Sequence, residues 1–184
     1  MQRRLFFAIC FEDAFRQHLS TLISQLKRSG ISGRFSRIEN LHLTLQFIGD
    51  VEDAILPDLS DILRKTAAQT AVFELSVSKL GCFGHRNDIL WLGLASSEQL
   101  ANVQRLLTQE LEKAGLPYER RAFKPHITLA RQAKINPGCL PAFDRFIPVF
   151  RQTVSDITLM ESLVLDGRRQ YRAVEKARLI STRK

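Results

Sequence analysis

Residues 40–49 read NLHLTLQFIG and residues 123–131 read FKPHITLAR. The likeness between these two segments is the strongest indication of the fold that the sequence contains. Each segment contains a histidine, an aliphatic residue, a threonine and a leucine in that order, starting at His42 in the first and at His126 in the second. The chain has four histidines, so half of them begin the same pattern. A single His-x-Thr sequence says little, whereas a doubled one is a specific signal.

Both segments have the period of a half-buried β-strand. In residues 41–48 the apolar residues at 43, 45 and 47 alternate with polar residues at 42, 44 and 46. Since residues i and i+2 of a strand point to the same side, the histidine and threonine of each motif share one face, and the leucines and Phe47 face the core. One motif lies in each half of the chain. We therefore expect the two His–Thr pairs to meet across a groove between the halves.

The segments around the motifs alternate between strand and helix patterns. The strand at 41–48 should close at Gly49-Asp50, and residues 136–148, which contain three prolines, should form a loop. Strands that alternate with single helices predict an α+β or α/β arrangement of two similar lobes. The other expected elements are helices at 12–27, 53–66 and 97–114 and strands at 5–10, 72–80, 89–95, 126–130, within 149–164 and at 171–179.

The composition is that of a soluble globular protein with an excess of basic residues. Hydrophobic residues make up 45% and charged residues 25% of the 184 residues, and the formal net charge is +8. This charge favours a polyanionic partner such as RNA, although proteins without one can be equally basic. The excess is largest after Asp166, where a cationic strip either neutralises phosphates or forms a solvated sheet edge. Its basic residues are Arg168, Arg169, Arg172, Lys176, Arg178, Arg183 and Lys184.

The cysteines and the hydropathy of the sequence indicate which cellular compartment and which cofactors to expect. Cys10, Cys82 and Cys139 include no Cys-x-x-Cys pair, so the sequence predicts neither a disulfide framework nor a zinc site, and we expect no metal and no cofactor. A reduced, cytoplasmic compartment fits best. No apolar stretch approaches the roughly 20 residues that span a bilayer, so we expect no membrane partner. The sequence also gives no sign of an obligate protein partner.

Two opposed imidazoles suit the hydrolysis of a phosphodiester. One group must take a proton from the attacking oxygen, and another must give a proton to the leaving oxygen. Imidazole, with an ordinary pKa of about 6.5, can do either near neutrality, so His42 and His126 are the candidate acid–base pair. The hydroxyls of Thr44 and Thr128 can donate hydrogen bonds to the non-bridging phosphate oxygens. A strained cyclic phosphate needs no metal to react with such a pair.

The two motifs resemble the signature of the RNA 2′,3′-cyclic phosphodiesterases, formerly described as 2′–5′ RNA ligases, of the two-histidine phosphoesterase superfamily. The likeness extends over nearly the whole chain and includes residues 4–8, 91–93 and Tyr171. It implies an α+β, bilobal fold of two pseudo-symmetric lobes, each with an antiparallel sheet and helices outside. The active cleft would lie between the lobes, within one domain of residues 1–184.

The resemblance also implies an activity and residue roles. The enzyme would open a 2′,3′-cyclic phosphodiester end of RNA to a 2′-phosphomonoester, with reversible 2′–5′ RNA ligation as a second reaction. His42 would be the proton donor to the departing 3′ oxygen, and His126 the proton acceptor that activates water. Thr44 and Thr128 would hold the phosphate.

Four further residues are candidates for contacts with the substrate. The guanidinium of Arg131 matches phosphate oxygens, but strand parity places it on the face opposite His126 unless the strand ends or bulges. The family resemblance suggests base stacking on Trp91, Phe123 or Tyr171. By the same parity argument, Phe47 belongs in the core.

Two alternatives remain at this point. One is a non-catalytic RNA-binding module, and the other is a two-histidine phosphodiesterase that acts on a different cyclic nucleotide. A pure binder has no need of titratable groups at two matched positions, so alanine variants of His42 and His126 distinguish catalysis from binding. The other histidines, His18 and His85, are expected at the surface.

Overall fold

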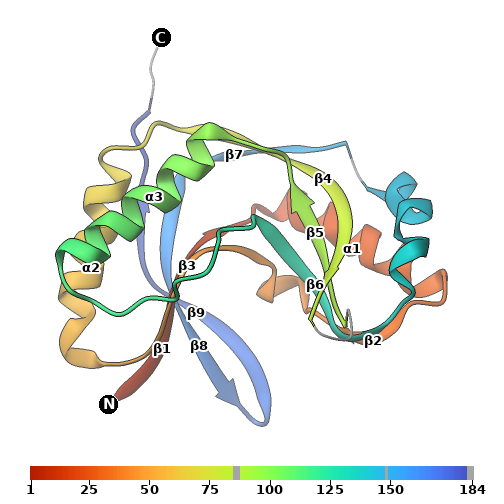
Figure 1. The fold of residues 1–184 in the computed structure, drawn as a ribbon, viewed down its shortest axis with the longest axis horizontal. Coiled ribbons are helices and arrows are strands. Elements are labelled where there is room, and N and C mark those ends of the chain that lie inside the picture. Colours follow the sequence, from red (N-terminus) through yellow and green to blue (C-terminus); the bar gives the residue numbers. More distant parts are fainter. Residues whose placement is uncertain (85–87, 148, 182–184) are drawn as a thin grey trace.

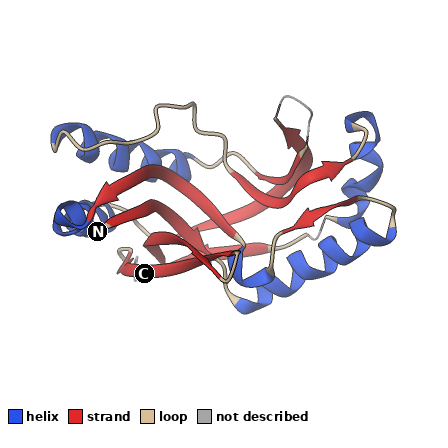
Figure 2. Ribbon diagram, turned by 90° about the horizontal axis from the view of Figure 1, so that it is seen from below, coloured by secondary structure: helices blue, strands red, loops and turns tan. Residues whose placement is uncertain are grey.

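Nine strands join into one curved antiparallel sheet in the computed structural model, which describes residues 1–84, 88–147 and 149–181 (Figure 1, Figure 2). The order across the sheet is β7-β4-β5-β6-β3-β1-β8-β9, and β2 pairs with β6 beside this path. The strands are β1 (Gln2–Cys10), β2 (Ser32–Phe35), β3 (His42–Glu52), β4 (Phe73–Phe83), β5 (Ile89–Leu94), β6 (His126–Lys134), β7 (Arg151–Val154), β8 (Asp156–Leu165) and β9 (Arg168–Arg178). The helices are α1 (Asp13–Arg28), α2 (Leu56–Ala67), α3 (Glu98–Lys113) and the 3-10 helices η1 (Ile38–Asn40), η2 (Asp53–Ile55) and η3 (Pro137–Phe146).

The sheet consists of two halves that meet at β3 and β6. One half contains β1, β3, β8 and β9, and the other contains β2, β4, β5, β6 and β7. The strands of the two halves pair at Leu43 and Ile127, and an isolated bridge also joins Ala71, before β4, to Ile180, after β9. β1, in contrast, pairs with β3 along its whole length. The predicted α+β fold of two lobes is confirmed, and the structure adds that the two sheets are continuous where β3 meets β6.

Two helices, α1 and α3, are exchanged between the halves: each follows a strand of one half in the chain but packs against the other half. α1 follows β1 in the chain but packs beside the other half, where Phe15 contacts Phe150 with ring centroids 5.4 Å apart. α3 connects β5 to β6 yet packs with α2 on the half that contains β3 (Figure 1). All three helices bury one apolar face, and Leu19, Leu59 and Leu107 are completely buried. Burial of a leucine side chain contributes about 1.5–3 kcal/mol to folding, so the exchanged helices hold the halves together.

The expected elements are confirmed with changes at their ends. β3 does not close at Gly49-Asp50, because β1 continues to pair with it as far as Glu52. Gly49, with φ +106°, lies within the strand, in a backbone conformation that residues other than glycine rarely adopt. The expected loop at 136–148 is largely the 3-10 helix η3, and β9 begins at Arg168 rather than at residue 171.

Candidate functional site

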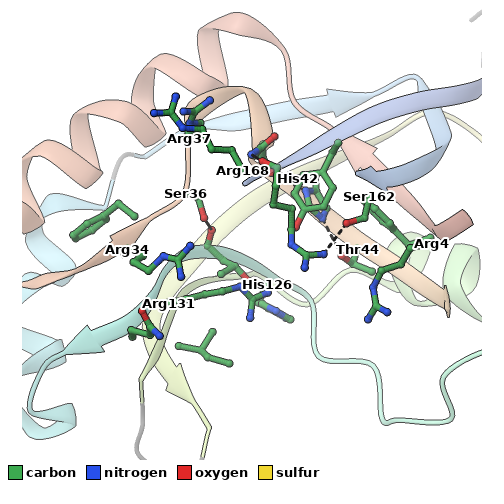
Figure 3. A pocket seen from close by; sticks show the side chains of 18 of the residues that line it. Arg4, Arg34, Ser36, Arg37, His42, Thr44, His126, Arg131, Ser162 and Arg168 are labelled. Carbon is green, nitrogen blue, oxygen red and sulfur yellow. Dashed lines mark hydrogen bonds between the residues drawn. The ribbon is translucent and has the colours of Figure 1, made fainter. Parts of the chain in front are cut away.

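The two His–Thr pairs meet where the two halves of the sheet join. His42 and Thr44 on β3 and His126 and Thr128 on β6 line one cleft of about 800 Å³ (Figure 3). Between them lie Leu43 and Ile127, which are completely buried and form the bridge. In an antiparallel pair centred on this bridge, each histidine lies opposite the other motif's threonine. The sequence-based expectation of a shared groove is therefore confirmed.

Each imidazole has its tautomer fixed by a backbone carbonyl two residues earlier in the chain. Nδ1 of His42 lies 2.8 Å from the carbonyl oxygen of Asn40, and Nδ1 of His126 lies 2.7 Å from that of Lys124. A carbonyl can only accept a hydrogen bond, so Nδ1 carries the proton in both rings. Nε2 of each neutral ring is therefore a free base, and that of His42 lies 3.2 Å from the hydroxyl of Thr44.

Burial keeps both imidazoles neutral in the unliganded protein. It lowers the pKa of His42 to about 4, against the opposing effect of the hydrogen bond to Asn40, and the nearby His126 and Arg131 lower it further. Burial also lowers the pKa of His126, and Arg131 acts in the same direction. A bound phosphate would bring negative charge to both rings and would favour their protonated forms.

A bulge at the leucine of each motif brings one more residue into the cleft. Thr44 and Gln46 of β3 pair with successive residues of β1, and Thr128 and Ala130 of β6 pair with successive residues of β5, so the leucine between them has no partner. The alternation then shifts by one residue, and the side chain five positions after each histidine turns to the cleft. These side chains are Phe47 and Arg131, and both line the cleft.

The two bulges change which way Phe47 and Arg131 point, compared with the simple alternation of side chains along a strand. The prediction that Phe47 packs in the main core was wrong, because it lies beside Phe6 on the cleft side, and Gln46 is buried in its place. Gln46 donates a hydrogen bond to the carbonyl oxygen of Glu119 at 2.9 Å. Arg131 faces the cleft because β6 bulges at Leu129, which is one of the two conditions under which the sequence allowed this orientation.

Aromatic rings flank both histidines. Phe6 and Tyr171 contact His42 with centroids 4.9 and 4.7 Å away. Phe83 lies edge-on to His126 at 4.8 Å. Sequence reasoning did not identify Phe6 or Phe83, although Phe6 belongs to the apolar run that was expected to form the first strand.

Of the three stacking candidates, only Tyr171 lines the cleft. Trp91 packs its indole over Gly81, where a methyl group would overlap the ring, and reaches His126 only edge-on, at 6.4 Å between centroids. Phe123 packs against the main hydrophobic core. Neither Trp91 nor Phe123 is among the residues that line the cleft, so the structure does not support a stacking role for either.

The remaining histidines lie away from the chemistry or cannot be placed. His18 is exposed on α1, as expected, and lies 4.4 Å from Phe150 between ring centroids. His85 lies outside the described residues.

The cleft is strongly basic. Among the described residues, its lining includes one carboxylate, that of Asp88, and six arginines. They are Arg4, Arg34, Arg37, Arg131, Arg168 and Arg169. Arg168 and Arg169 belong to the predicted cationic strip, while Arg172 and Lys176 of the same strip pair instead with Glu161 and Asp156. Arg183 and Lys184 lie outside the described residues.

The part of the chain that the structure describes has neither a cluster of metal ligands nor a helix that could span a membrane. It contains no group of three or more His, Cys, Asp or Glu residues arranged to hold a metal ion. None of its helices is long and apolar enough to cross a bilayer.

Known proteins resemble the chain in both sequence and structure. The family model described as the 2′-5′ RNA ligase superfamily matches residues 11–164. The RNA 2′,3′-cyclic phosphodiesterase of Methanothermobacter thermautotrophicus is 34% identical over 133 residues, which are 71% of this chain and 72% of that protein. The crystal structure of E. coli LigT in apo form has a TM-score of 0.80 at 27% identity and covers 97% of this chain and 98% of that chain. LigT complexed with 3′-AMP gives 0.78 at 26% identity, with the same coverage.

Proposed function

The chain belongs to the 2′-5′ RNA ligase superfamily, and we propose that His42 and His126 act in it as the acid–base pair of an RNA 2′,3′-cyclic phosphodiesterase. The chain hydrolyses 2′,3′-cyclic phosphodiester ends of RNA as a two-histidine phosphoesterase. The observation that supports these roles best is the pair of imidazoles in one basic cleft, each with Nδ1 bound to a backbone carbonyl and Nε2 unprotonated.

The reaction needs two proton transfers and one substitution at phosphorus. His126 Nε2 takes a proton from water, whose oxygen bonds to phosphorus. The bond from phosphorus to the 3′ oxygen breaks, and the protonated Nε2 of His42 gives its proton to that oxygen. The product carries a 2′-phosphomonoester and a free 3′ hydroxyl. The assignment of His42 as donor and His126 as acceptor follows the family resemblance.

Thr44, Thr128 and Arg131 stabilise the negative charge that builds up on the phosphate. Hydroxyl and guanidinium donors that are already oriented need no reorganisation when the charge develops. In the free protein Thr44 is engaged with His42. Binding of substrate replaces that hydrogen bond by one from Thr44 to phosphate and by one from His42 to the leaving oxygen. If the 5′ hydroxyl of another RNA takes the place of water, the same proton transfers form a 2′–5′ linkage and release the 3′ hydroxyl, and this ligation is reversible.

The direct test uses a short RNA that ends in a 2′,3′-cyclic phosphate, with EDTA present. We expect complete conversion to a 2′-phosphate end, which chromatography against authentic 2′- and 3′-phosphate standards distinguishes from the 3′-phosphate isomer of the same mass. A 3′-phosphate product would reverse the identity of the leaving oxygen. Binding of this RNA without any conversion would favour the RNA-binding module instead.

The pH dependence follows from the lowered pKa values. The active form has His42 protonated and His126 neutral, and kcat/KM reports the free protein. Because the pKa of His42 is about 4 and that of His126 is below its usual 6.5, we expect kcat/KM to reach its maximum on the acidic side of neutrality and to fall as the pH rises. The maximum of kcat should lie at higher pH, since bound phosphate raises the pKa of His42. A flat profile would contradict the pair mechanism.

The acidic limb of this profile needs a stability control. An imidazole whose pKa is lower in the folded than in the unfolded state favours unfolding once the unfolded state takes up the proton. Stability should therefore decrease as the pH falls from about 6.5 towards 4, and circular dichroism at each pH separates this loss from catalysis.

We also propose one functional domain of residues 1–184 and a cytoplasmic location. The exchange of α1 and α3 between the halves supports the single domain. Cys10, Cys82 and Cys139 are all free thiols, which is the usual state in a reducing compartment.

A further inference from the structure

The six arginines of the cleft differ in the partners of their guanidinium groups. Arg4 pairs with Asp50 at 2.7 Å, and Arg169 donates a hydrogen bond to the hydroxyl of Ser162 at 2.8 Å. Arg37 lies 3.8 Å from Glu39, and both of these side chains are largely exposed, so the pair is weak. Within residues 1–84, 88–147 and 149–181, Arg34, Arg131, Arg168 and Arg169 make no ion pair, and of these Arg169 is occupied by its hydrogen bond to Ser162.

Arg34 and Arg131 are held opposite each other. They are register partners across β2 and β6, and both line the cleft. Like charges directly opposite each other in a sheet are destabilising. The two strands are closely packed beside this pair, since a Cβ on Gly33 would lie 2.9 Å from the Cα of Ala133. The repulsion between the two guanidinium groups is relieved when a phosphate binds beside each of them.

The segment that carries Arg34 and Arg37 is attached to the second motif. The backbone N–H of Ser36 donates to the carbonyl oxygen of Leu129 at 2.8 Å, and the hydroxyl of Ser36 donates to the carbonyl oxygen of Thr128, also at 2.8 Å. Two arginines are thus fixed relative to the proposed phosphate-binding threonine. A preorganised site loses less entropy when a ligand binds.

The β8–β9 hairpin supplies the third arginine. Its turn residues Asp166 and Gly167 both have positive φ, and Arg168 follows as the first residue of β9. The side chain of Asn40 donates to the carbonyl oxygen of Arg169 at 3.0 Å, which joins this hairpin to η1, next to Arg37. In Figure 3, Arg34, Arg37 and Arg168 lie on one side of the two histidines and Arg4 lies on the other.

We propose that Arg34, Arg37 and Arg168 form a second phosphate subsite, which binds the 5′-phosphate group of the nucleotide whose cyclic phosphate reacts. This inference rests on the proposed function and narrows the substrate to RNA ends and nucleotides that carry a 5′-phosphate group. The cyclic phosphate already has Thr44, Thr128 and Arg131, and its single charge cannot neutralise all the free arginines. The volume of about 800 Å³ also lies near the upper end of the roughly 300–1,000 Å³ of ligand pockets.

Three substrates and two products test the subsite. The substrates are adenosine 2′,3′-cyclic phosphate, the same compound with a 5′-phosphate, and the dinucleotide ApA with a 2′,3′-cyclic phosphate end. We expect the 5′-phosphate to raise kcat/KM by about tenfold or more, which corresponds to one additional charge-assisted hydrogen-bonded contact. Calorimetry should show a similar preference for adenosine 2′,5′-bisphosphate over adenosine 2′-phosphate.

The double variant Arg34→Gln/Arg168→Gln should bring both ratios close to one. Arg105→Gln is the matched control, because Arg105 lies on α3, outside the cleft lining, and its guanidinium donates hydrogen bonds to Asn102 and Gln109 of the same helix. The double variant should melt no lower than the wild type, since it removes a repulsive pair. Wild-type ratios near one, or unchanged ratios in the double variant, would refute the subsite.

The outcomes separate the subsite from the activity and identify the source of the phosphate. Hydrolysis without any 5′-phosphate preference retains the function and rejects the subsite. Selective bisphosphate binding without hydrolysis retains the subsite and rejects the function. A preference that extends to the dinucleotide identifies the internucleotide phosphate of an RNA end, whereas one limited to the 5′-monoester identifies a free nucleotide.

Discussion

Replacement of His42 or His126 by alanine is expected to slow the hydrolysis of a 2′,3′-cyclic phosphate end by a factor of about 10² to 10⁴. This is the usual contribution of one general acid or base, and the hydrogen bond of each Nδ1 to a backbone carbonyl leaves each Nε2 as the nitrogen that exchanges a proton. Turnover at saturating substrate should fall in both variants. The double variant should be only slightly slower than either single one, because the two residues act as a unit.

The control for this result is His18→Ala. His18 is an exposed imidazole on α1, outside the cleft, so its loss should leave turnover within about twofold of the wild type. Circular dichroism and melting temperature establish that each variant is folded. A folded His42→Ala or His126→Ala protein that retains the wild-type rate would contradict the proposed mechanism.

The largest expected loss of stability comes from Glu161→Gln. Glu161 is 4% exposed on β8, and its carboxylate accepts two hydrogen bonds from Arg3, at 2.9 and 2.6 Å, and one from Arg172 at 2.7 Å. Removal of one partner from such a buried group leaves the others uncompensated and costs about 3 kcal/mol of unfolding free energy. Urea denaturation at pH 7 measures this difference.

The same carboxylate predicts an acid transition. The hydrogen bonds from Arg3 lower the pKa of Glu161 to about 2, and Arg172 contributes in the same direction. Its stabilisation is therefore complete above the usual pKa of about 4.5 and is lost as the pH falls from there to about 2. Glu74→Gln is the matched control, because Glu74 and Arg151 form an exposed pair worth less than about 1 kcal/mol. Equal losses in the two variants would refute a special role for Glu161.

The sequence predicted the centre of the site because that prediction needs only local geometry. A strand places His42 beside Thr44 and His126 beside Thr128 whatever its neighbours are. The same argument was wrong for Phe47, because the bulge at Leu45 arises from pairing with β1, which is distant in sequence. Where parity depends on a partner strand, one segment's pattern cannot determine it.

Residues outside the motifs were harder to predict for a related reason. Arg34 and Arg37 lie in a short segment with no clear periodicity, and they reach the cleft only because β2 pairs with β6. Phe83 contacts His126 across the β4–β5 hairpin. Tyr171 was identified through the family resemblance, which stands in for long-range contacts that a single sequence does not reveal.

The connection of the halves at Leu43 and Ile127 also has a consequence for the order of folding. The chain passes back and forth between the halves, so neither half is a continuous piece that could form alone as it leaves the ribosome. Pairings between distant segments form slowly, because loop closure costs entropy before the contacts stabilise it. The bridge that brings the two imidazoles together requires β3 and β6, both already in place. Enzymatic activity should therefore return in the last phase of refolding, after the helical circular dichroism signal.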